Sequence, residues 1–366
     1  MNAGKLENAD DHLIYRVAQL FIASRKKTDD DAKKLSKTLA GFIADTISAE
    51  FPEARFTREM VWPFAGEAVR RGFLVLVPPF DLQMQQSLVA KYPHLADRLH
   101  VVRTANRLDN KKVSEAAAKI ALDHVKKLAA TLDGRPLGLG LGPGRATRDF
   151  CESFGRLMAG EQETLPKLDL IAITAGCPAK EPEHASISFF NFFEDRFVHG
   201  RTGLFAETLV SARDFPKIQK RAGVKEAFAA RNSIHMVVTS MGDLNDEHDL
   251  LRVFLKESGV DVAALCKRGW LGNVQYRPYT SQGPIKEEKN DLRAVTLFEL
   301  DDLAKMAARD DKRVILIARQ CARCERTRAS TLEPLLREDS KLRVFSDLVL
   351  DTETCRELVG QKAPKT

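Results

Sequence analysis

Residues 138–147 form the segment of this sequence with the clearest chemical meaning. The segment reads GLGLGPGRAT, and its last positions include Gly142, Gly144, Arg145, Ala146 and Thr147. Glycines let the backbone approach a ligand closely, and the N–H groups at the start of a following helix attract an anion. Arg145 adds a positive charge and Thr147 adds a hydroxyl group. The segment therefore predicts a site for a phosphate or a polyol.

Three kinds of ligand loop carry glycines at comparable spacing. A dinucleotide loop requires G-x-G-x-x-G, but Arg145 or Thr147 stands at the sixth position, depending on the glycine from which the motif is counted. A methyltransferase-type loop fits the alternating glycines, although Gly138 stands where an acidic residue is usual. A sugar-phosphate loop is the third alternative. A glycine turn that serves tight packing alone is a further interpretation, and the occurrence of glycines, a proline and an arginine together counts against it.

Small and polar residues also stand at the ends of three other apolar runs. These residues are Thr174, Ala175, Gly176, Ser240, Gly242, Asp243, Arg319 and Gln320. The carboxylate of Asp243 could bind sugar hydroxyls, act as a base or cap the next helix. If the runs are parallel strands, their carboxyl ends meet at one edge of the sheet, where ligands bind in such folds. We therefore expect the loops after these runs to line one pocket.

The cysteines and histidines of the chain form no motif that identifies a metal site or a nucleophile. Cys321 and Cys324 make a C-x-x-C, but no second cysteine pair completes a zinc site. A redox pair is one interpretation, and two reduced thiols is the simpler one. Neither H-E-x-x-H nor G-x-S-x-G occurs. We expect no metal and no cofactor, and the lack of a nucleophile counts mildly against an enzyme.

Composition indicates an ordinary globular chain. It has 366 residues, is 44% hydrophobic and 30% charged, and carries a net charge of +6, which predicts two or three domains. The start, MNAGKLENADDHLIYR, lacks the basic and apolar parts of a signal peptide, and no apolar run approaches the ~20 residues of a membrane span. We expect a soluble, cytoplasmic protein. The net charge alone does not indicate whether the protein binds nucleic acid.

From about residue 97 onward, short apolar runs alternate with helical patterns. The runs are 137–141, 168–174, 234–240, 314–318 and one near 344–350, and the helical patterns include 113–132, 246–257, 298–308 and 351–359. Apolar runs separated by helices predict a mostly parallel sheet covered on both faces, hence an α/β fold. The stretch 276–291 is expected to be a loop.

The first 80 residues have a different pattern. Three apolar stripes at helical spacing are followed by a predicted strand at 73–77 and by Pro78-Pro79, while the charged stretch 25–34 is expected to be a loop or helix start. The third helix is predicted over 57–71, and Pro63 should kink it unless this proline lies in the first turn. Because the pattern changes after Pro78-Pro79, we predict a small helical domain over residues 1–80 and an α/β domain over residues 81–366.

Eight segments together resemble one family. They are LIYRVAQLF, TREMVWPFAGEAVRRGFLVLVPP, GLGLGPGRATRDF, LIAITAG, IHMVVTSMGD, GWLGNVQYRPYTSQG, VILIARQ and LVLDTETCRELV. Their order resembles that of SorC-type sugar-binding transcriptional regulators. In that family, a winged helix-turn-helix precedes an effector domain related in fold to ribose-5-phosphate isomerase and glucosamine-6-phosphate deaminase.

The resemblance implies roles for individual residues. Gly142 and the run 144–147 correspond to the family's loop that contacts phosphate and sugar. Residues 174–176, with Ser240, Gly242 and Asp243, correspond to its second and third pocket loops. Asn273 stands where the family has an acid, and Arg319 and Gln320 stand where it often has glycines.

The function implied by the resemblance is regulation of transcription in response to a sugar or sugar phosphate. Thr57, Arg58 and Trp62 would meet bases and phosphates, while Arg70 and Arg71 would contact phosphates only. The implied partners are operator DNA, a phosphorylated sugar and a second copy in a homodimer or homotetramer. Two alternatives stay open. One is an isomerase, deaminase or lactonase on the same fold, and the other is a binding module that has lost DNA recognition.

Overall fold

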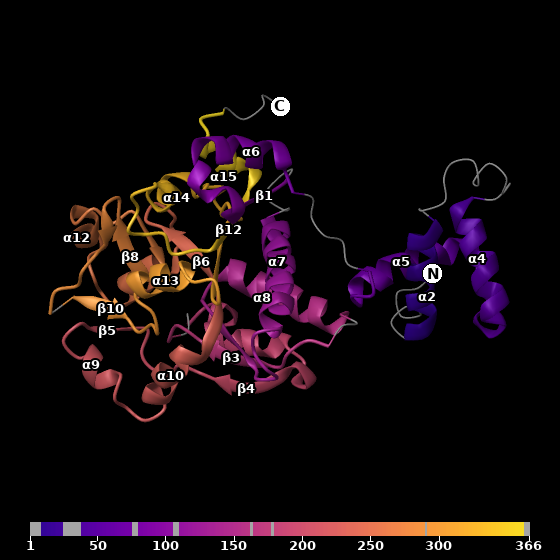
Figure 1. Cartoon of the computed structure of the whole chain (residues 1–366), viewed down its shortest axis with the longest axis horizontal. Coiled ribbons are helices and arrows are strands. Elements are labelled where there is room, and N and C mark those ends of the chain that lie inside the picture. Colours follow the sequence, from indigo (N-terminus) through magenta and orange to yellow (C-terminus); the bar gives the residue numbers. More distant parts are fainter. Residues whose placement is uncertain are drawn as a thin grey trace. The chain divides into compact units, whose positions relative to one another are not determined.

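The computed structural model describes residues 9–24, 38–74, 80–104, 110–161, 164–176, 179–289 and 291–361. The chain divides into two compact units, Met1–Leu76 and Val77–Thr366, whose elements are labelled in Figure 1. Within the described residues, no helix is long and apolar enough to cross a membrane.

The smaller unit is helical. Its helices are α2 (Asp11–Ser24), α4 (Leu39–Glu50) and α5 (Val61–Arg70), with the 3-10 turns η1 (Pro52–Ala54) and η2 (Arg58–Met60) between the last two. One side of each helix is apolar, and the three apolar sides form a common core around Ile14, Val17, Ile43, Ile47 and Phe64. The three stripes seen in the sequence are thus confirmed as three helices.

The third helix differs from its predicted bounds. Residues Arg58–Met60 form a 3-10 turn, so the α-helix begins at Val61. Pro63 lies in its first turn, where the missing N–H would have no helical partner, and the proline therefore causes no kink. Residues 72–74 are turn and bend rather than strand. The rest of the predicted strand, Pro78-Pro79 and the charged stretch 25–34 lie outside the described residues.

The larger unit is built on seven parallel strands. In spatial order they are β1 (Leu99–Val102), β12 (Asp347–Asp351), β11 (Arg313–Ala318), β6 (Ile234–Asp243), β2 (Leu137–Leu141), β3 (Leu168–Ala172) and β4 (Val198–Thr202). Each pair of neighbours in this order is parallel. The predicted mostly parallel α/β fold is therefore confirmed.

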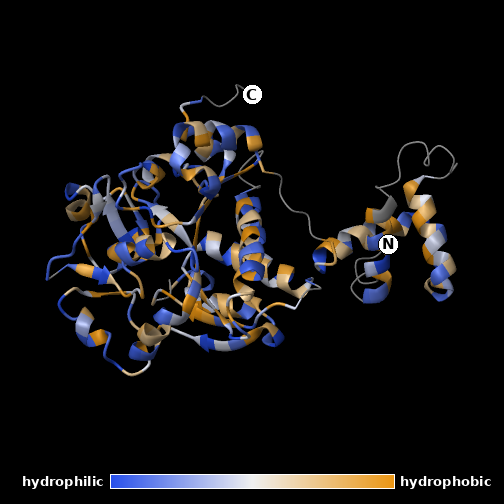
Figure 2. Ribbon diagram, viewed as in Figure 1, coloured by the Kyte–Doolittle hydropathy of each residue, from blue (hydrophilic) through white to orange (hydrophobic). Residues whose placement is uncertain are grey.

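Helices cover both faces of this sheet. One face carries α7 (Lys111–Ala129) and α8 (Arg145–Ala159), and the other carries α6 (Leu82–Lys91), α10 (Val224–Ala230), α13 (Leu300–Ala307), α14 (Ala329–Leu336) and α15 (Thr352–Leu358). Successive strand residues enter opposite cores: Val238 packs with Phe150 and Phe154, and its neighbour Val237 packs with the other layer. Figure 2 shows the apolar colouring along these strands.

One expected loop contains strands. The last residues of β6 pair antiparallel with β7 (Gly272–Val274), which continues into β8 (Arg277–Thr280) and β9 (Gly283–Pro284). The prediction that residues 276–291 form a loop is therefore wrong at β8 and β9, which are strands. The turn between β7 and β8 consists of Gln275 and Tyr276, with φ of 55° and 62°. Two residues at positive φ are typical of a type I′ hairpin turn.

The remaining elements connect these layers. They are η3 (Pro93–Arg98), η5 (Pro182–His184), η6 (Ser186–Phe192), η7 (Asp195–Phe197), β5 (Leu209–Ser211), α9 (Phe215–Ile218), η8 (Arg231–Ser233), α11 (Leu250–Glu257), α12 (Val262–Lys267) and β10 (Leu292–Ala294). The strands β5 and β10 form a separate antiparallel pair.

The strand order places a switch point beside β6. From β2 the chain proceeds outward to β3 and β4, whereas from β6 it proceeds in the opposite direction to β11 and β12. In parallel sheets the crevice at such a point, outside the carboxyl ends of the strands, is where ligands bind. The loops after β2, β6 and β11 therefore meet at one edge.

A buried carboxylate connects three elements on one side of the sheet. Asp347, at the start of β12, contacts His100 Nε2 on β1 at 3.3 Å and His124 Nε2 on α7 at 3.0 Å. Burial alone would raise the pKa of Asp347, but the hydrogen bonds to the two histidines hold it well below its usual range. Because the folded pKa is below the unfolded one, Asp347 stabilises the fold fully above about pH 4 and loses this effect as the pH falls further.

We predict that Asp347→Asn lowers the free energy of unfolding by about 1.5–3 kcal/mol at pH 7, the cost typical of losing a charge-assisted hydrogen bond. The difference from the wild type should shrink when urea unfolding is repeated below pH 4. Asp195→Asn, whose side chain is 92% exposed, is the control and should change stability little. If the free energy of unfolding differed equally between wild type and Asp347→Asn at pH 7 and at pH 3, the lowered pKa assigned to Asp347 would be contradicted.

Candidate functional site

A pocket opens at the carboxyl ends of β2, β6 and β11. Its lining comes from four segments: Pro143, Gly144, Arg145 and Ala146; Ser240, Met241, Gly242, Asp246, His248, Asp249 and Leu250; Asn273, Gln275 and Tyr276; and Ile317, Arg319, Gln320, Cys321, Ala322, Arg323 and Arg328. The cavity measures about 110 Å³, smaller than the ~300–1,000 Å³ of sites for drug-sized molecules. A ligand of this pocket must be compact or must displace side chains.

The amino terminus of α8 lies at this pocket. Gly144 is the residue before the helix, and its φ of 101° belongs to the left-handed region that favours glycine. Gly144 has no side chain to cap the helix, so the N–H groups of the first turn receive no capping bond from it. In a helix of 15 residues, these N–H groups and the helix dipole make the terminus attractive to an anion.

Two arginines at the pocket share one carboxylate. Arg145 at the start of α8 is bonded to Glu181, and Arg323 Nη2 lies 2.6 Å from Glu181 Oε1. Burial raises the pKa of Glu181, but the hydrogen bond from Arg323 and the charges of both arginines outweigh burial and lower the pKa overall. Glu181 is therefore an anion held between the two positive charges.

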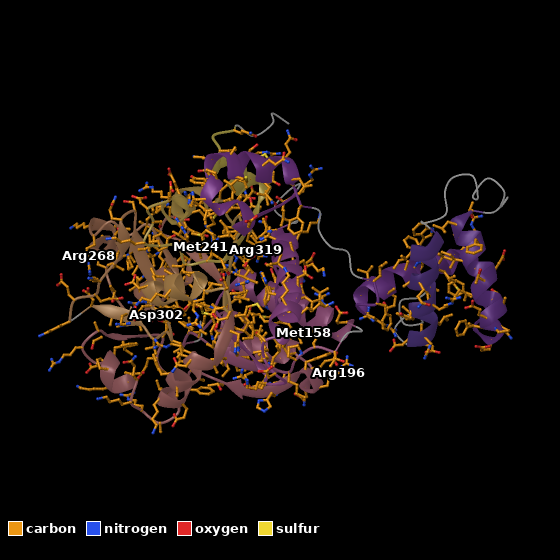
Figure 3. All side chains as sticks on the ribbon, viewed as in Figure 1. Met158, Arg196, Met241, Arg268, Asp302 and Arg319 are labelled. Atoms are coloured by element: carbon orange, nitrogen blue, oxygen red, sulfur yellow. The ribbon has the colours of Figure 1, made fainter. Side chains whose placement is uncertain are left out.

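Arg319 is labelled in Figure 3, and its guanidinium is buried in an ion pair with Asp149. Its Nη1 lies 2.7 Å from Asp149 on α8 and 3.3 Å from the hydroxyl of Ser114 on α7, and the side chain is 11% exposed. Arg319 therefore joins both helices to the end of β11. The backbone N–H of Gln320 donates to the buried Asp351 at 2.7 Å. Both residues line the pocket, and both make structural contacts there.

The floor of the pocket contains a buried acid and amide. Asn273 Nδ2 donates to Asp249 Oδ2 at 2.9 Å, and Asp249 also accepts the N–H of Arg252 at 3.0 Å. Burial raises the pKa of Asp249 to about 6. A Cβ atom on Gly242 would lie 1.7 Å from Asp249 Oδ2, so only glycine fits at this position.

Gln275 is a pocket residue that the sequence analysis missed. Its side chain is buried at 1% exposure, and its backbone adopts the left-handed region within the β7–β8 turn. Neither its amide oxygen nor its amide nitrogen has a hydrogen-bond partner among the described residues. An unpaired buried amide is rare, and a ligand, an ion or an ordered water is among the groups that can satisfy it. No sequence motif points to Gln275, because its burial depends on the hairpin.

The structure brings together most of the predicted pocket residues. Those that line it are Gly144, Arg145, Ala146, Ser240, Gly242, Asn273, Arg319 and Gln320. Gly142 and Thr147 lie behind the lining. A Cβ on Gly142 would be 2.3 Å from Thr239 Oγ1, so this glycine serves strand packing, and the hydroxyl of Thr147 donates to the carbonyl of Pro143 at 3.2 Å.

Four other predicted residues do not line the pocket. Thr174, Ala175 and Gly176 follow β3, one strand further along the edge, and the hydroxyl of Thr174 is bonded to Ser186 at 2.7 Å. Asp243 is 1% exposed and accepts the N–H of Asn245 at 2.8 Å. Thr174 and one carboxylate oxygen of Asp243 are thus engaged in local hydrogen bonds, and contact of these four residues with a ligand stays a prediction.

Four further pocket-side residues come from two distant segments. Asp246 and His248 follow β6, and Cys321 and Cys324 follow β11. The C-x-x-C was visible in the sequence. The proximity of Asp246 and His248 to it was not visible, because only the pairing of β6 with β11 brings these two segments together.

The predicted DNA-contacting residues differ in their exposure. Thr57 and Arg58 are exposed, and Trp62 is 59% exposed with its ring edge-on to Phe21 at 5.4 Å. These residues precede or begin α5 and remain accessible.

Arg70 and Arg71 both bond Glu67 within α5. Arg70 is 62% exposed, while Arg71 is 17% exposed and also bonds Asp11 at the start of α2. The hydrogen bonds from the two arginines lower the pKa of Glu67 to about 2. Arg71 therefore stabilises the packing of α5 on α2.

The fold matches solved structures of transcriptional regulators. Full-length SorC, the sorbitol operon regulator from Klebsiella pneumoniae, aligns with a TM-score of 0.61 at 16% identity, covering 96% of this chain and 100% of that one. The chain has the SorC fold. A DeoR family transcriptional regulator from Listeria monocytogenes aligns with a TM-score of 0.55 at 14% identity, over 76% of this chain and 98% of its own. A transcriptional regulator from Streptococcus pneumoniae aligns with a TM-score of 0.56 at 13% identity, covering 76% of this chain and 96% of its own.

Comparison by sequence adds nothing to this likeness. No family model matches the chain, and no curated protein is similar to it in sequence. The predicted resemblance to SorC-type regulators is thus confirmed at the level of the fold. Because 96% of the chain aligns with full-length SorC, the SorC fold includes most of both units.

We predict that Gly242→Ala lowers the free energy of unfolding by about 1–3 kcal/mol, because the added Cβ must displace Asp249 from Asn273. Gly66→Ala is the control. Gly66 lies within α5, and nothing lies within 4 Å of the place that a methyl group would occupy, so alanine there should stabilise the helix by up to about 1 kcal/mol. Urea unfolding of both variants measures the difference. Wild-type stability of Gly242→Ala would show that the floor is not packed as described.

Proposed function

We propose that this chain is a DNA-binding transcriptional regulator whose larger unit binds a phosphorylated sugar. The observation that carries the proposal is the alignment with full-length SorC over 96% of this chain, since SorC is the regulator of a sorbitol operon. The pocket supports the proposal independently, because it offers a helix amino terminus and two arginines beside polar groups.

The pocket chemistry suits a compact polyol that carries an anion. The first turn of α8 and the side chains of Arg145 and Arg323 would hold the phosphate, which would replace Glu181 between the arginines. The free amide of Gln275 offers one donor group and one acceptor to sugar hydroxyls. Ser240 lies beside Gly144 and adds a hydroxyl.

The smaller unit would contact DNA through the start of α5. Trp62 and Gly66 are exposed and lie four residues apart on α5, so they share one face of this helix, and the exposed Arg58 lies in the 3-10 turn just before it. A helix of this kind enters the major groove with its first residues at the base edges. Residues 1–80 contain 12 Lys or Arg and 11 Asp or Glu, a net charge of only +1. Useful affinity therefore needs two copies on one DNA, and we propose a homodimer or homotetramer.

An enzyme on the same fold is the alternative that this proposal displaces. Asp243 was the acid or base on which the enzyme hypothesis depended, but its side chain is buried outside the pocket lining. Incubation of the protein with those sugar phosphates that raise its melting temperature distinguishes the two hypotheses. We expect the sugar phosphate to be recovered unchanged.

We predict that Arg145→Ala weakens binding of a phosphorylated sugar by about 1.5–3 kcal/mol, the contribution of a charge-assisted hydrogen bond. Glu181→Gln should have the opposite effect. It removes the competing anion, and binding should become tighter by roughly 0.5–1 kcal/mol. Thermal-shift screening of sugar phosphates identifies the ligand, and calorimetry measures both affinities.

Arg156→Ala is the matched control for this pair, because Arg156 is in the last turn of α8, at the end opposite the pocket. It should bind like the wild type. If neutral sugars raise the melting temperature and phosphorylated sugars do not, the assignment of a phosphate is wrong.

We predict that Arg58→Ala weakens binding to the DNA upstream of the protein's own gene and lowers the slope of log K against log salt by about one. Arg70→Ala should also weaken binding and lower the salt slope, and it should do so equally for all DNA sequences, because a phosphate contact carries no sequence information. Fluorescence anisotropy at several salt concentrations measures both effects. Arg196→Ala, on the larger unit, is the control and should bind normally.

Removal of residues 1–80 should abolish DNA binding and leave sugar binding intact. A full-length protein that is monomeric and binds DNA without salt dependence, or not at all, would contradict the proposed regulator.

A further inference from the structure

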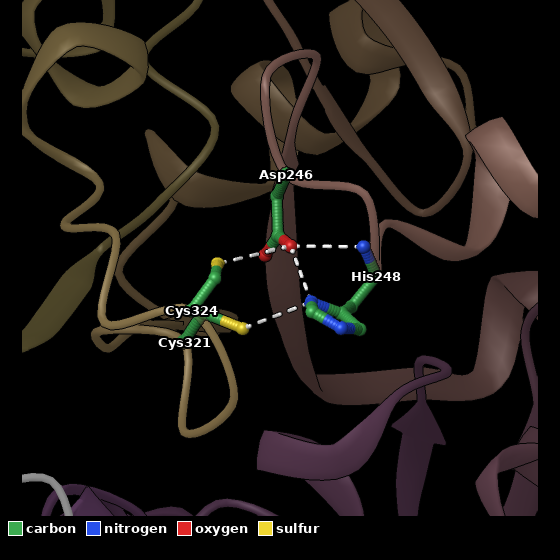
Figure 4. A group of neighbouring side chains, drawn as sticks. All are labelled: Asp246, His248, Cys321 and Cys324. Atoms are coloured by element: carbon green, nitrogen blue, oxygen red, sulfur yellow. Dashed lines mark hydrogen bonds and ion pairs between the residues drawn. The ribbon is translucent and has the colours of Figure 1, made fainter.

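Four side chains with metal-binding atoms converge at the pocket, and three of them belong to its lining. Asp246 and His248 lie on the loop after β6, and Cys321 and Cys324 lie on the loop after β11 (Figure 4). Their four potential ligand atoms, one from each residue, all lie within 4.8 Å of one another. We propose that these residues bind a zinc ion. This inference does not depend on the function proposed above.

The measured separations agree with the edges of a zinc tetrahedron. Zn–S bonds of about 2.3 Å and Zn–N or Zn–O bonds of about 2.0–2.2 Å place neighbouring ligand atoms about 3.4–3.8 Å apart. Cys321 Sγ lies 3.8 Å from His248 Nδ1, Cys324 Sγ lies 3.4 Å from Asp246 Oδ1, and His248 Nδ1 lies 3.1 Å from Asp246 Oδ1. Three of the six edges are therefore within a few tenths of an ångström of a zinc tetrahedron, and all six are within 4.8 Å.

The cysteine segment has the form of a zinc knuckle. Two cysteines separated by two residues are the spacing with which one turn supplies two thiolates to zinc. The turn is fixed by backbone bonds from Cys321 N to Arg326 O and from Glu325 N to Cys321 O, both 2.9 Å, and Glu325 adopts a φ of 57°. The backbone thus directs both thiols to one side without any contribution from a metal.

Arg328 orients the carboxylate ligand. Its Nη2 lies 2.6 Å from Asp246 Oδ2, which leaves Oδ1 facing the imidazole and the thiols. Such outer contacts commonly fix the ligands of metal sites. The charges also agree, because zinc with two thiolates and one carboxylate carries one negative charge, which the buried guanidinium balances.

The ligand set selects the metal. Thiolate and imidazole ligands favour zinc over magnesium and calcium, which prefer oxygen. Binding releases the two thiol protons to solvent and involves no change of oxidation state. The ion would join the loops after β6 and β11 and would fix the turn that carries Arg323 at the pocket.

Metal analysis of the full-length protein, purified under reducing conditions, tests the site. After dialysis against a weak chelator, we expect one zinc per chain, and cobalt should replace it with the intense visible bands of a tetrahedral thiolate site. Cys321→Ser with Cys324→Ser should abolish zinc binding and the cobalt bands. His248→Gln, a milder change at a partly exposed side chain, should weaken zinc binding at least tenfold.

Cys266→Ser is the matched control, because Cys266 is an exposed free thiol on α12. It should keep one zinc. Hydrogen exchange should slow in residues 319–326 when zinc is added to the metal-free protein, and circular dichroism checks that each variant folds. Failure of the folded, fully reduced wild type to bind zinc would overturn the proposal. Equal zinc binding by the double cysteine variant would do the same.

Discussion

The parallel pairing of β6 with both β11 and β2 is the constraint on which the rest of the larger unit depends. This pairing sets the register Leu316 to Thr239 on one side and Leu141 to Val238 on the other, so three carboxyl ends finish at one edge. The polar groups of the pocket lie at the end of β6, at the start of α8, on the loops after β6 and β11, or on the hairpin that extends β6. A shift of one residue in either register would turn each strand's side chains to the wrong core.

Positive charge at the pocket is balanced by acids of the same chain. Arg319 faces Asp149, Arg328 faces Asp246, and Arg145 shares Glu181 with Arg323. The first two pairs are largely buried, and removing one partner would leave a costly unpaired charge, so these arginines serve the structure. Glu181 is the partner that an incoming anion can replace, since both arginines bonded to it remain partly exposed.

Much of this arrangement could be predicted from the sequence. The apolar runs at 137–141 and 314–318 became β2 and β11 with nearly the same bounds. β11 contains five consecutive buried aliphatic residues, and β2 alternates three leucines with two glycines, all buried, as expected for strands covered on both faces. The loop from Gly144 to Ala146, expected to contact the ligand, lines the cavity at this edge, and its contact with a ligand stays a prediction. Thr174 and Asp243 lie at the expected edge but outside the lining, because strand ends predict which edge a residue is on and not which way its side chain points.

What the sequence did not reveal depends on contacts between distant segments. Gln275 is buried only because β7 and β8 form a hairpin on the extension of β6, and no local pattern distinguishes it from an exposed turn residue. The partners of the C-x-x-C could not be predicted from the sequence for the same reason. Cys321 and His248, for example, are more than 70 positions apart in the chain. A ligand set divided between two loops has no sequence signature of its own. It can be recognised only once the register of the strands beneath those loops is known, which makes the pairing of β6 with β11 the origin of both the pocket and the cluster beside it.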